Sequence, residues 1–167
     1  MPNYEGTTEN CGKKWIIPLP NEGFPGEIYS SKEIIDKILS STNGKKNCDC
    51  MWHYKSCKWM LVERKGIGKL KKAIEQLRET YKEAKNKNKN VMYFLVIYSG
   101  KDKGGKEWNA YDIKDTKDSP TGKVIWNKRS TRGKPVEIDG KPIWAIKEED
   151  IEHYRKKIEK EKNIDEY

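Results

Sequence analysis

Asp49, Glu63 and Lys65 are the residues of this chain whose types and spacing could carry hydrolytic chemistry. Carboxylate oxygens select hard cations such as Mg²⁺ or Mn²⁺. A metal ion held by Asp49 and Glu63 would polarise a phosphoryl oxygen, and the Lys65 ammonium would orient or help to deprotonate the attacking water. The three side chains therefore predict a hydrolytic site for phosphodiesters, provided that the fold brings them together.

Two predicted strands decide whether these side chains meet. Residues 48–54 and 57–65 are rich in aromatic and β-forming types, and the polar pair at 55–56 separates them, so they predict a hairpin. Residues two apart on a strand share a face, so Glu63 and Lys65 project together while Arg64 points away. Asp49 joins them if residue 49 pairs with residue 63, which requires an odd-numbered loop such as 55–57. A two-residue loop would pair 49 with 62 and turn the carboxylates to opposite faces.

The best helix pattern in the chain follows this hairpin. Apolar residues recur at spacings of three and four over 67–86, at Ile67, Leu70, Ile74, Leu77, Tyr81 and Ala84. The uninterrupted apolar run at 91–98 then predicts a buried strand. A strand, a helix and a strand in this order favour a right-handed βαβ unit with parallel outer strands.

The segments on either side of this unit carry weaker patterns. Residues 1–29 predict an irregular arm with one short strand around 15–17, and a capping box from Ser30 to Glu33 predicts a helix over 30–41. Further strands are expected around 108–113, 124–126, 136–138 and 143–146, the last two joined by a turn at 139–140, before a helix at 147–161. We therefore expect one α/β domain over 1–167. Its core at 30–99 has a central mixed sheet flanked by helices, and a β-rich extension with a C-terminal helix follows at 100–167.

This order of elements resembles the PD-(D/E)XK nuclease superfamily, which includes archaeal Holliday junction resolvases and many restriction endonucleases. In that family a helix precedes a strand ending in Asp, and a hairpin leads to a strand ending in Glu-x-Lys, a helix and another strand. The resemblance covers about 27–98. It implies a restriction-endonuclease-like core, a Mg²⁺- or Mn²⁺-dependent endonuclease acting on DNA, and a homodimer. It also implies that Asp49 and Glu63 are metal ligands and that Lys65 is the catalytic lysine.

The same resemblance suggests two further site residues. The family often adds a Glu from its first helix, for which Glu33, or Glu27 just before it, is the candidate, although Glu33 also fits as a capping-box residue. Many RecB-like members place Gln, Leu and Tyr on the helix after the lysine, and Gln76 with Tyr81 is similar to this pattern, with the tyrosine one residue late. The sequence departs from the family at Cys48, which replaces the usual proline before the Asp.

Positive charge is concentrated in the middle of the chain. The net charge is +9, and the excess of Lys and Arg falls on 63–90 and 101–147. This pattern predicts a polyanion-binding face without identifying the polyanion, and the resemblance implies that the partner is DNA. The alternative is a lysine-rich surface that binds no ligand. The expected nucleic-acid contacts are Lys69, Lys71, Lys72 and Arg78 on the cationic helix, and Lys128, Arg129, Arg132 and Lys134 in a cationic loop.

Several other classes of protein are disfavoured. The apolar run at 91–98 is far shorter than the roughly 20 residues that span a bilayer, so we expect no membrane segment and a cytoplasmic location. His53 and His153 have no Ser or Cys nucleophile at a matching spacing, which argues against a catalytic triad. Two alternatives stay open: a protein-interaction domain, and a non-catalytic nucleic-acid-binding module with a structural zinc held by Cys48, Cys50, His53 and Cys57.

Overall fold

A computed structural model describes residues 22–23, 25–30, 34–39, 48–100, 111–128 and 134–151. Its strands form one sheet in the order β1-β2-β3-β4-β8-β6-β5, and β7 pairs with β8. β3, β4 and β8 are parallel neighbours, whereas the other paired strands are antiparallel. The fold is therefore mixed α/β, as predicted. The strands are β1 (Glu27–Ser30), β2 (Cys50–His53), β3 (Trp59–Gly66), β4 (Val91–Ser99), β5 (Tyr111–Asp115), β6 (Lys123–Asn127), β7 (Glu137–Ile138) and β8 (Lys141–Lys147).

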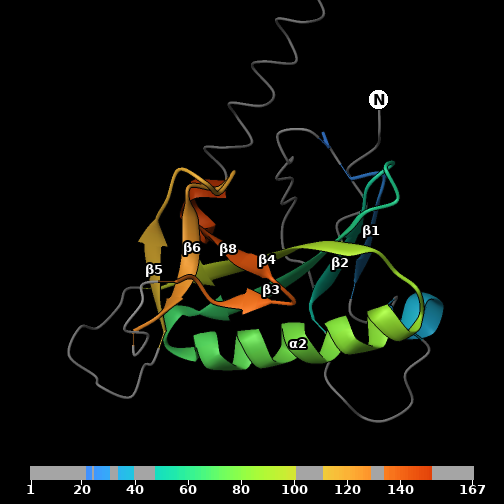
Figure 1. The fold of residues 1–167 in the computed structure, drawn as a ribbon, viewed down its shortest axis with the longest axis horizontal. Helices are drawn as coiled ribbons and strands as arrows, with labels where there is room; N and C mark the ends of the chain where they lie inside the picture. The colour runs from blue at the N-terminus through green and yellow to red at the C-terminus, as the bar shows by residue number, and fades with distance from the viewer. Residues whose placement is uncertain are drawn as a thin grey trace, which may run out of the picture.

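A strand–helix–strand unit lies at the centre of the fold. β3 leads through the 3₁₀ turn η4 (Ile67–Lys69) into α2 (Leu70–Asn86), and β4 then runs parallel to β3. The helix lies along one face of the sheet (Figure 1). The predicted helix at 67–86 and its parallel flanking strands are confirmed. The side chains that α2 buries are Leu70, Ala73, Ile74, Leu77, Thr80 and Ala84.

The central strands bury side chains on both faces of the sheet. Leu61 of β3 and Phe94 of β4 are register partners and pack in the core beneath α2. The next pair along the same strands, Val62 and Leu95, packs in a second core on the opposite face. Because successive strand residues point to opposite faces, a strand buried on both sides needs a continuous apolar run. This explains why the sequence at 91–98 does not alternate between apolar and polar residues.

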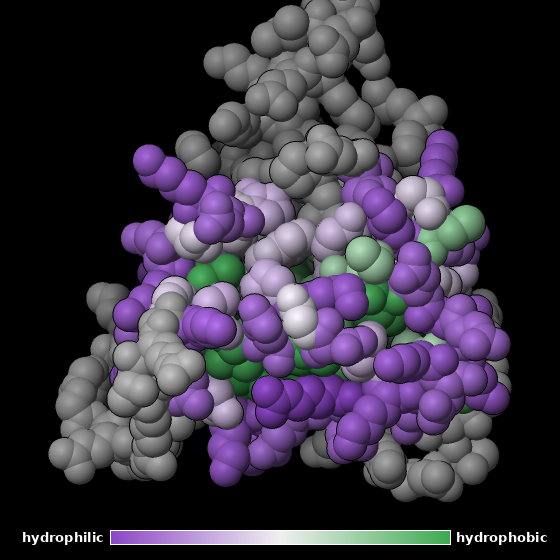
Figure 2. Space-filling view, viewed as in Figure 1, coloured by the Kyte–Doolittle hydropathy of each residue, from purple (hydrophilic) through white to green (hydrophobic). Residues whose placement is uncertain are grey.

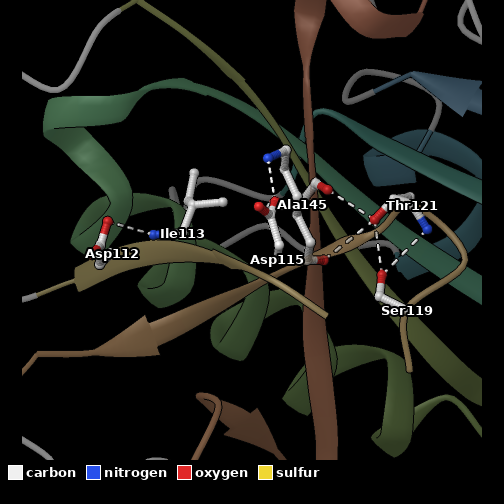
Figure 3. Close-up of polar contacts among 7 residues, drawn as sticks. Asp112, Ile113, Asp115, Ser119, Thr121 and Ala145 are labelled. Atoms are coloured by element: carbon white, nitrogen blue, oxygen red, sulfur yellow. Dashed lines mark hydrogen bonds and ion pairs between the residues drawn. The ribbon is translucent and has the colours of Figure 1, made fainter. Parts of the chain in front are cut away.

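The C-terminal strands continue this sheet. β5 and β6 form an antiparallel hairpin, and β6 pairs with β8 at Val124 and Trp144. Thr121, in the turn before β6, reinforces this junction because its hydroxyl donates to the Ala145 carbonyl of β8 at 2.8 Å (Figure 3). The Thr121 N–H also donates to the Ser119 hydroxyl at 3.2 Å, which closes the turn.

Most of the elements predicted for this region are present. β5, β6, β7 and β8 overlap their predicted strands, and residues 108–110 of the first prediction lie outside the described residues. Asp139 and Gly140 form the β7–β8 turn with φ angles of 51° and 77°, the left-handed conformation that this type of hairpin turn requires. Residues 148–151 are helical and Ile151 is buried, as expected for the start of the final helix, the rest of which lies outside the described residues. Within the described ranges no helix is long and apolar enough to cross a bilayer.

The N-terminal predictions need correction. Glu27–Ser30 forms β1, which pairs with β2, although the sequence predicted an irregular arm at this position. Ser30 is the last residue of that strand, and residues 31–33, where the predicted helix would begin, lie outside the described residues. The described helical residues nearby form a single π-helical turn, η3 (Ile34–Leu39), whose Ile34 and Leu39 are buried against the α2 side of the sheet. The predicted strand around 15–17 and Glu33 lie outside the described residues.

Candidate active site

The β2–β3 hairpin has the odd-numbered turn that the carboxylates require. Residues 55–57 form the turn, because Tyr54 and Lys58 are joined by a hydrogen bond of 2.9 Å from the Tyr54 N–H to the Lys58 carbonyl. Farther along the hairpin, His53 pairs with Trp59 and Cys50 pairs with Val62. One more step in this register places residue 49 opposite residue 63. Asp49 lies one residue before β2, beside Glu63 at this end of the hairpin, and Glu63 lies on the side of the sheet that α2 covers.

Glu63 is a fully buried carboxyl group. Its side chain has 0% exposure, and neither carboxyl oxygen has a hydrogen-bond partner. Lys65, two residues along the same face, is 25% exposed and its Nζ lies 3.5 Å from Glu63 Oε1, which is long for a hydrogen bond. Arg64 points to the opposite side and contacts Glu148 at 2.6 Å. The alternation predicted for these three residues is confirmed.

Asp49 is held beside Glu63 by the backbone of β3. The Arg64 N–H donates to Asp49 Oδ2 at 2.8 Å, so the Asp49 carboxylate crosses to the strand that carries Glu63. Burial, the largest cause, and the negative charge of Asp49 together raise the pKa of Glu63 to about 9, whereas the positive charge of Lys65 acts in the opposite direction. Asp49 is thus close enough to disfavour the ionisation of Glu63.

Cys48 lies on the α2 side of the sheet, which the strand pattern did not predict. Residues two apart on a regular strand share a face, but Cys48 belongs to the core beneath α2 and Cys50 to the opposite core. The reason is that β2 begins only at Cys50, so regular alternation does not reach residue 48. Burial raises the pKa of the Cys48 thiol, and the charges of Glu63 and Asp49 raise it further. A neutral thiol therefore sits close to both carboxyl groups.

A threonine on α2 contacts the chain just before Asp49. The Cys48 N–H donates to Thr80 Oγ1 at 2.8 Å, and the Thr80 hydroxyl donates to the Gln76 carbonyl at 2.8 Å. Gln76 lies one turn earlier on α2, and its side-chain Oε1 is buried without a hydrogen-bond partner. The sequence patterns indicated Gln76 as a site residue but did not indicate Thr80. The available signal was a hydroxyl residue within the apolar stripe of α2, between Leu77 and Ala84.

The donor set fits a hard divalent cation. Glu63 presents two buried oxygens without partners, Asp49 presents a second carboxylate, and their mutual repulsion is the kind that a cation relieves. Mg²⁺ commonly takes one or two carboxylates and completes its shell with water and substrate phosphates. Two protein ligands are therefore sufficient for Mg²⁺, and the described part of the chain holds no group of three or more His, Cys, Asp or Glu side chains suited to a metal.

The remaining predicted site residues are not brought to this pair. Glu27 is exposed and pairs with His53, at the end of β2 far from Asp49, so this alternative to Glu33 is wrong. The predicted DNA contacts that the structure describes are exposed, on and beside α2 and at the two ends of the cationic loop: Lys69, Lys71, Lys72, Arg78, Lys128 and Lys134. Figure 2 shows a broad hydrophilic surface where α2 lies. Arg129 and Arg132 lie outside the described residues.

The cysteines do not form a zinc cluster in the described structure. Cys48 and Cys50 lie in opposite cores, Cys50 is disulfide-bonded, and Cys57 is exposed in the hairpin turn. His53 stacks on Trp59 with ring centroids 4.1 Å apart. A zinc site needs several of these side chains to converge on one point. This arrangement does not favour the zinc-module alternative.

Comparisons with protein-family models, with curated proteins and with solved structures found no match to this chain.

Proposed function

We propose that this protein is a Mg²⁺- or Mn²⁺-dependent endonuclease that hydrolyses phosphodiester bonds in DNA, built on a restriction-endonuclease-like core. The observation that carries the proposal is the proximity of the Asp49 carboxylate to the buried Glu63 at the end of the β2–β3 hairpin, with Lys65 on the same face of β3 as Glu63. The arrangement of β2, β3, α2 and β4 supports the core. It has an antiparallel hairpin, then a helix, then a strand parallel to the Glu-x-Lys strand.

Asp49 and Glu63 would hold the metal ion, whose chemistry is to polarise the phosphoryl oxygen and to lower the pKa of a bound water. Lys65 keeps its ammonium partly exposed beside Glu63, so it can reach a water or a phosphate oxygen at the mouth of the site. Gln76 Oε1, buried and without a partner on the helix that covers this face, can accept a hydrogen bond from a bound water. The Glu63 carboxyl group and Gln76 Oε1 have no hydrogen-bond partner, and the Lys65 side chain is partly exposed, so all three are available for these roles.

The distribution of charge supports DNA as the substrate. α2 follows the end of β3 that carries Lys65. Lys69, Lys71 and Lys72 therefore lie at the same end of β3 as the carboxylates. Arg78 lies roughly 12 Å along the helix from Leu70, the first residue of α2, at a rise of about 1.5 Å per residue. Exposed cations near the site can contact phosphates on either side of the bond that is cut. The predicted homodimer and cytoplasmic location remain predictions.

Cleavage of DNA with and without Mg²⁺ tests the proposal. We expect the wild-type chain to cleave DNA only with Mg²⁺ or Mn²⁺, Glu63→Ala to lose this cleavage, and Lys65→Ala to lower its rate about 100-fold or more. Glu137→Ala is the matched control, because Glu137 is exposed on β7 at the opposite end of β8 from the site. Cleavage that Glu63→Ala and Lys65→Ala leave unchanged would remove both residues from the mechanism.

A further inference from the structure

Thr80 links α2 to the chain segment that presents Asp49. Its side chain is fully buried, and its hydroxyl uses both of its hydrogen-bonding functions. It accepts the Cys48 N–H and donates to the Gln76 carbonyl, both at 2.8 Å. A hydroxyl is the smallest side-chain group that can accept and donate together. This residue thus ties the backbone next to Asp49 to a fixed point on the helix.

The position of Asp49 needs such a link because residue 49 precedes the regular part of β2. The strand begins at Cys50, so the chain at 48–49 follows a path of its own. Cys48 turns towards α2 and its thiol donates to the Cys50 carbonyl at 3.1 Å, while the Asp49 carboxylate reaches the Arg64 N–H. The contact with Thr80 fixes this turn from the helix side, and the contact with Arg64 fixes it from the β3 side.

We propose that Thr80 is a positioning residue for the metal site: its hydroxyl holds the Cys48 N–H and thereby places the Asp49 carboxylate opposite Glu63. This inference rests on the proposed function, because it assigns Thr80 to the assembly of that same site. It also explains why position 48 is not a proline. A proline there has no N–H and would leave the Thr80 oxygen without this donor.

Two pairs of variants isolate the hydroxyl group. Thr80→Val differs from the wild type by the hydroxyl at nearly constant shape, and Thr80→Ala differs from Thr80→Ser in the same way. The full chain is titrated with Mn²⁺ alone, without DNA, and binding is followed by electron paramagnetic resonance. Removal of a group that orients a ligand typically costs about 10- to 100-fold in metal affinity. We expect that loss in Thr80→Val and Thr80→Ala, and wild-type affinity in Thr80→Ser.

A structural control separates positioning from a general loss of stability. Tyr93→Phe removes the hydrogen bond of 3.0 Å from the Tyr93 hydroxyl to Glu22, beside the start of β3 and away from the carboxylates. We expect Tyr93→Phe to melt at a lower temperature and to bind Mn²⁺ as the wild type does. DNA binding in EDTA should be the same in every Thr80 variant. If Thr80→Val does not fold, the comparison of Thr80→Ala with Thr80→Ser still decides the question.

The outcomes separate this inference from the proposed function. Wild-type Mn²⁺ binding that Glu63→Gln abolishes, and that is weakened in each variant without the hydroxyl, supports both. Equal Mn²⁺ affinity in Thr80→Val and wild type, or in Thr80→Ala and Thr80→Ser, overturns the positioning role alone. Absence of Mn²⁺ binding by the wild type overturns the proposed function and this inference with it.

Discussion

Replacing Glu63 with Gln should change how the stability of the metal-free protein depends on pH. Glu63 is fully buried, and burial together with the charge of Asp49 raises its pKa from the ordinary value of 4.5 to about 9. The folded protein therefore keeps a proton on Glu63 at neutral pH, whereas the unfolded chain releases it. A group whose folded pKa is raised gives its full stability below the unfolded pKa, and that stability is lost as pH rises towards the folded pKa. The wild type should thus lose stability between pH 4.5 and 9, and Glu63→Gln should not lose this contribution.

The size of the effect at pH 7 follows from the unfolded pKa. Each pH unit above 4.5 adds about 1.4 kcal/mol to the cost of keeping the proton in the folded state. The cost reaches about 3 kcal/mol at pH 7, and it does not depend on the folded pKa as long as that pKa lies above 7. Domains are stable by only about 5–15 kcal/mol, so the difference is readily measured. A buried Gln amide without partners has its own cost, but that cost does not change with pH.

Urea denaturation of both proteins in EDTA, at intervals from pH 4 to pH 8, measures this difference. We expect the free energy of unfolding of Glu63→Gln minus that of the wild type to rise by about 3 kcal/mol between pH 4 and pH 7. Addition of Mg²⁺ should stabilise the wild type increasingly as pH rises, because the metal competes with the proton, and should leave Glu63→Gln unchanged. Parallel stability curves for the two proteins in EDTA would refute the assignment of Glu63 as a buried, protonated carboxyl.

Substitutions at three further positions test the elements that support the site. Glu22 accepts hydrogen bonds from Lys58 and Tyr93, and the bond from Lys58 is the main cause of its lowered pKa. Glu22→Gln should therefore lower the free energy of unfolding more at pH 7 than at pH 3, as measured by urea denaturation, and an equal loss at both pH values would contradict this. Cys57 has φ of 63° in the hairpin turn, so Cys57→Gly should raise the free energy of unfolding by about 1 kcal/mol while Cys57→Ala does not. Gly140 has φ of 77°, so Gly140→Ala should lower it by about 1 kcal/mol, whereas Gly68→Ala, in open space, should change thermal stability little.

The centre of the fold could be predicted because its patterns are long and repeated. The helix at 67–86 shows five consecutive helical spacings, and the run at 91–98 is apolar without interruption, so the βαβ unit was predicted correctly. The face shared by Glu63 and Lys65 followed from strand alternation alone. The hairpin was predicted too, but the sequence allowed turns of two or three residues, and only the structure shows that 55–57 form the turn.

The elements that could not be predicted depend on contacts between distant segments. β1 is short and follows a segment rich in Gly and Pro, and it exists because it pairs with β2. Ser30, the first residue of the capping-box pattern, is the last residue of β1 and pairs with Cys50. Cys48 precedes the regular part of β2, and its N–H donates to Thr80, 32 residues later. Side-chain preference within a short window contains no information about such partners.

The three-residue turn between β2 and β3 makes the number of residues there more important than their identity. A substitution at 55–57 changes only local stability, since these residues are exposed and lie at the end of the hairpin away from Asp49. An insertion or deletion of one residue would invert β2 relative to β3, with its buried side chains exchanged between the two cores. We therefore expect substitutions in this turn to be tolerated. An insertion or deletion of a single codon would disrupt the packing of both cores and separate the two carboxyl groups.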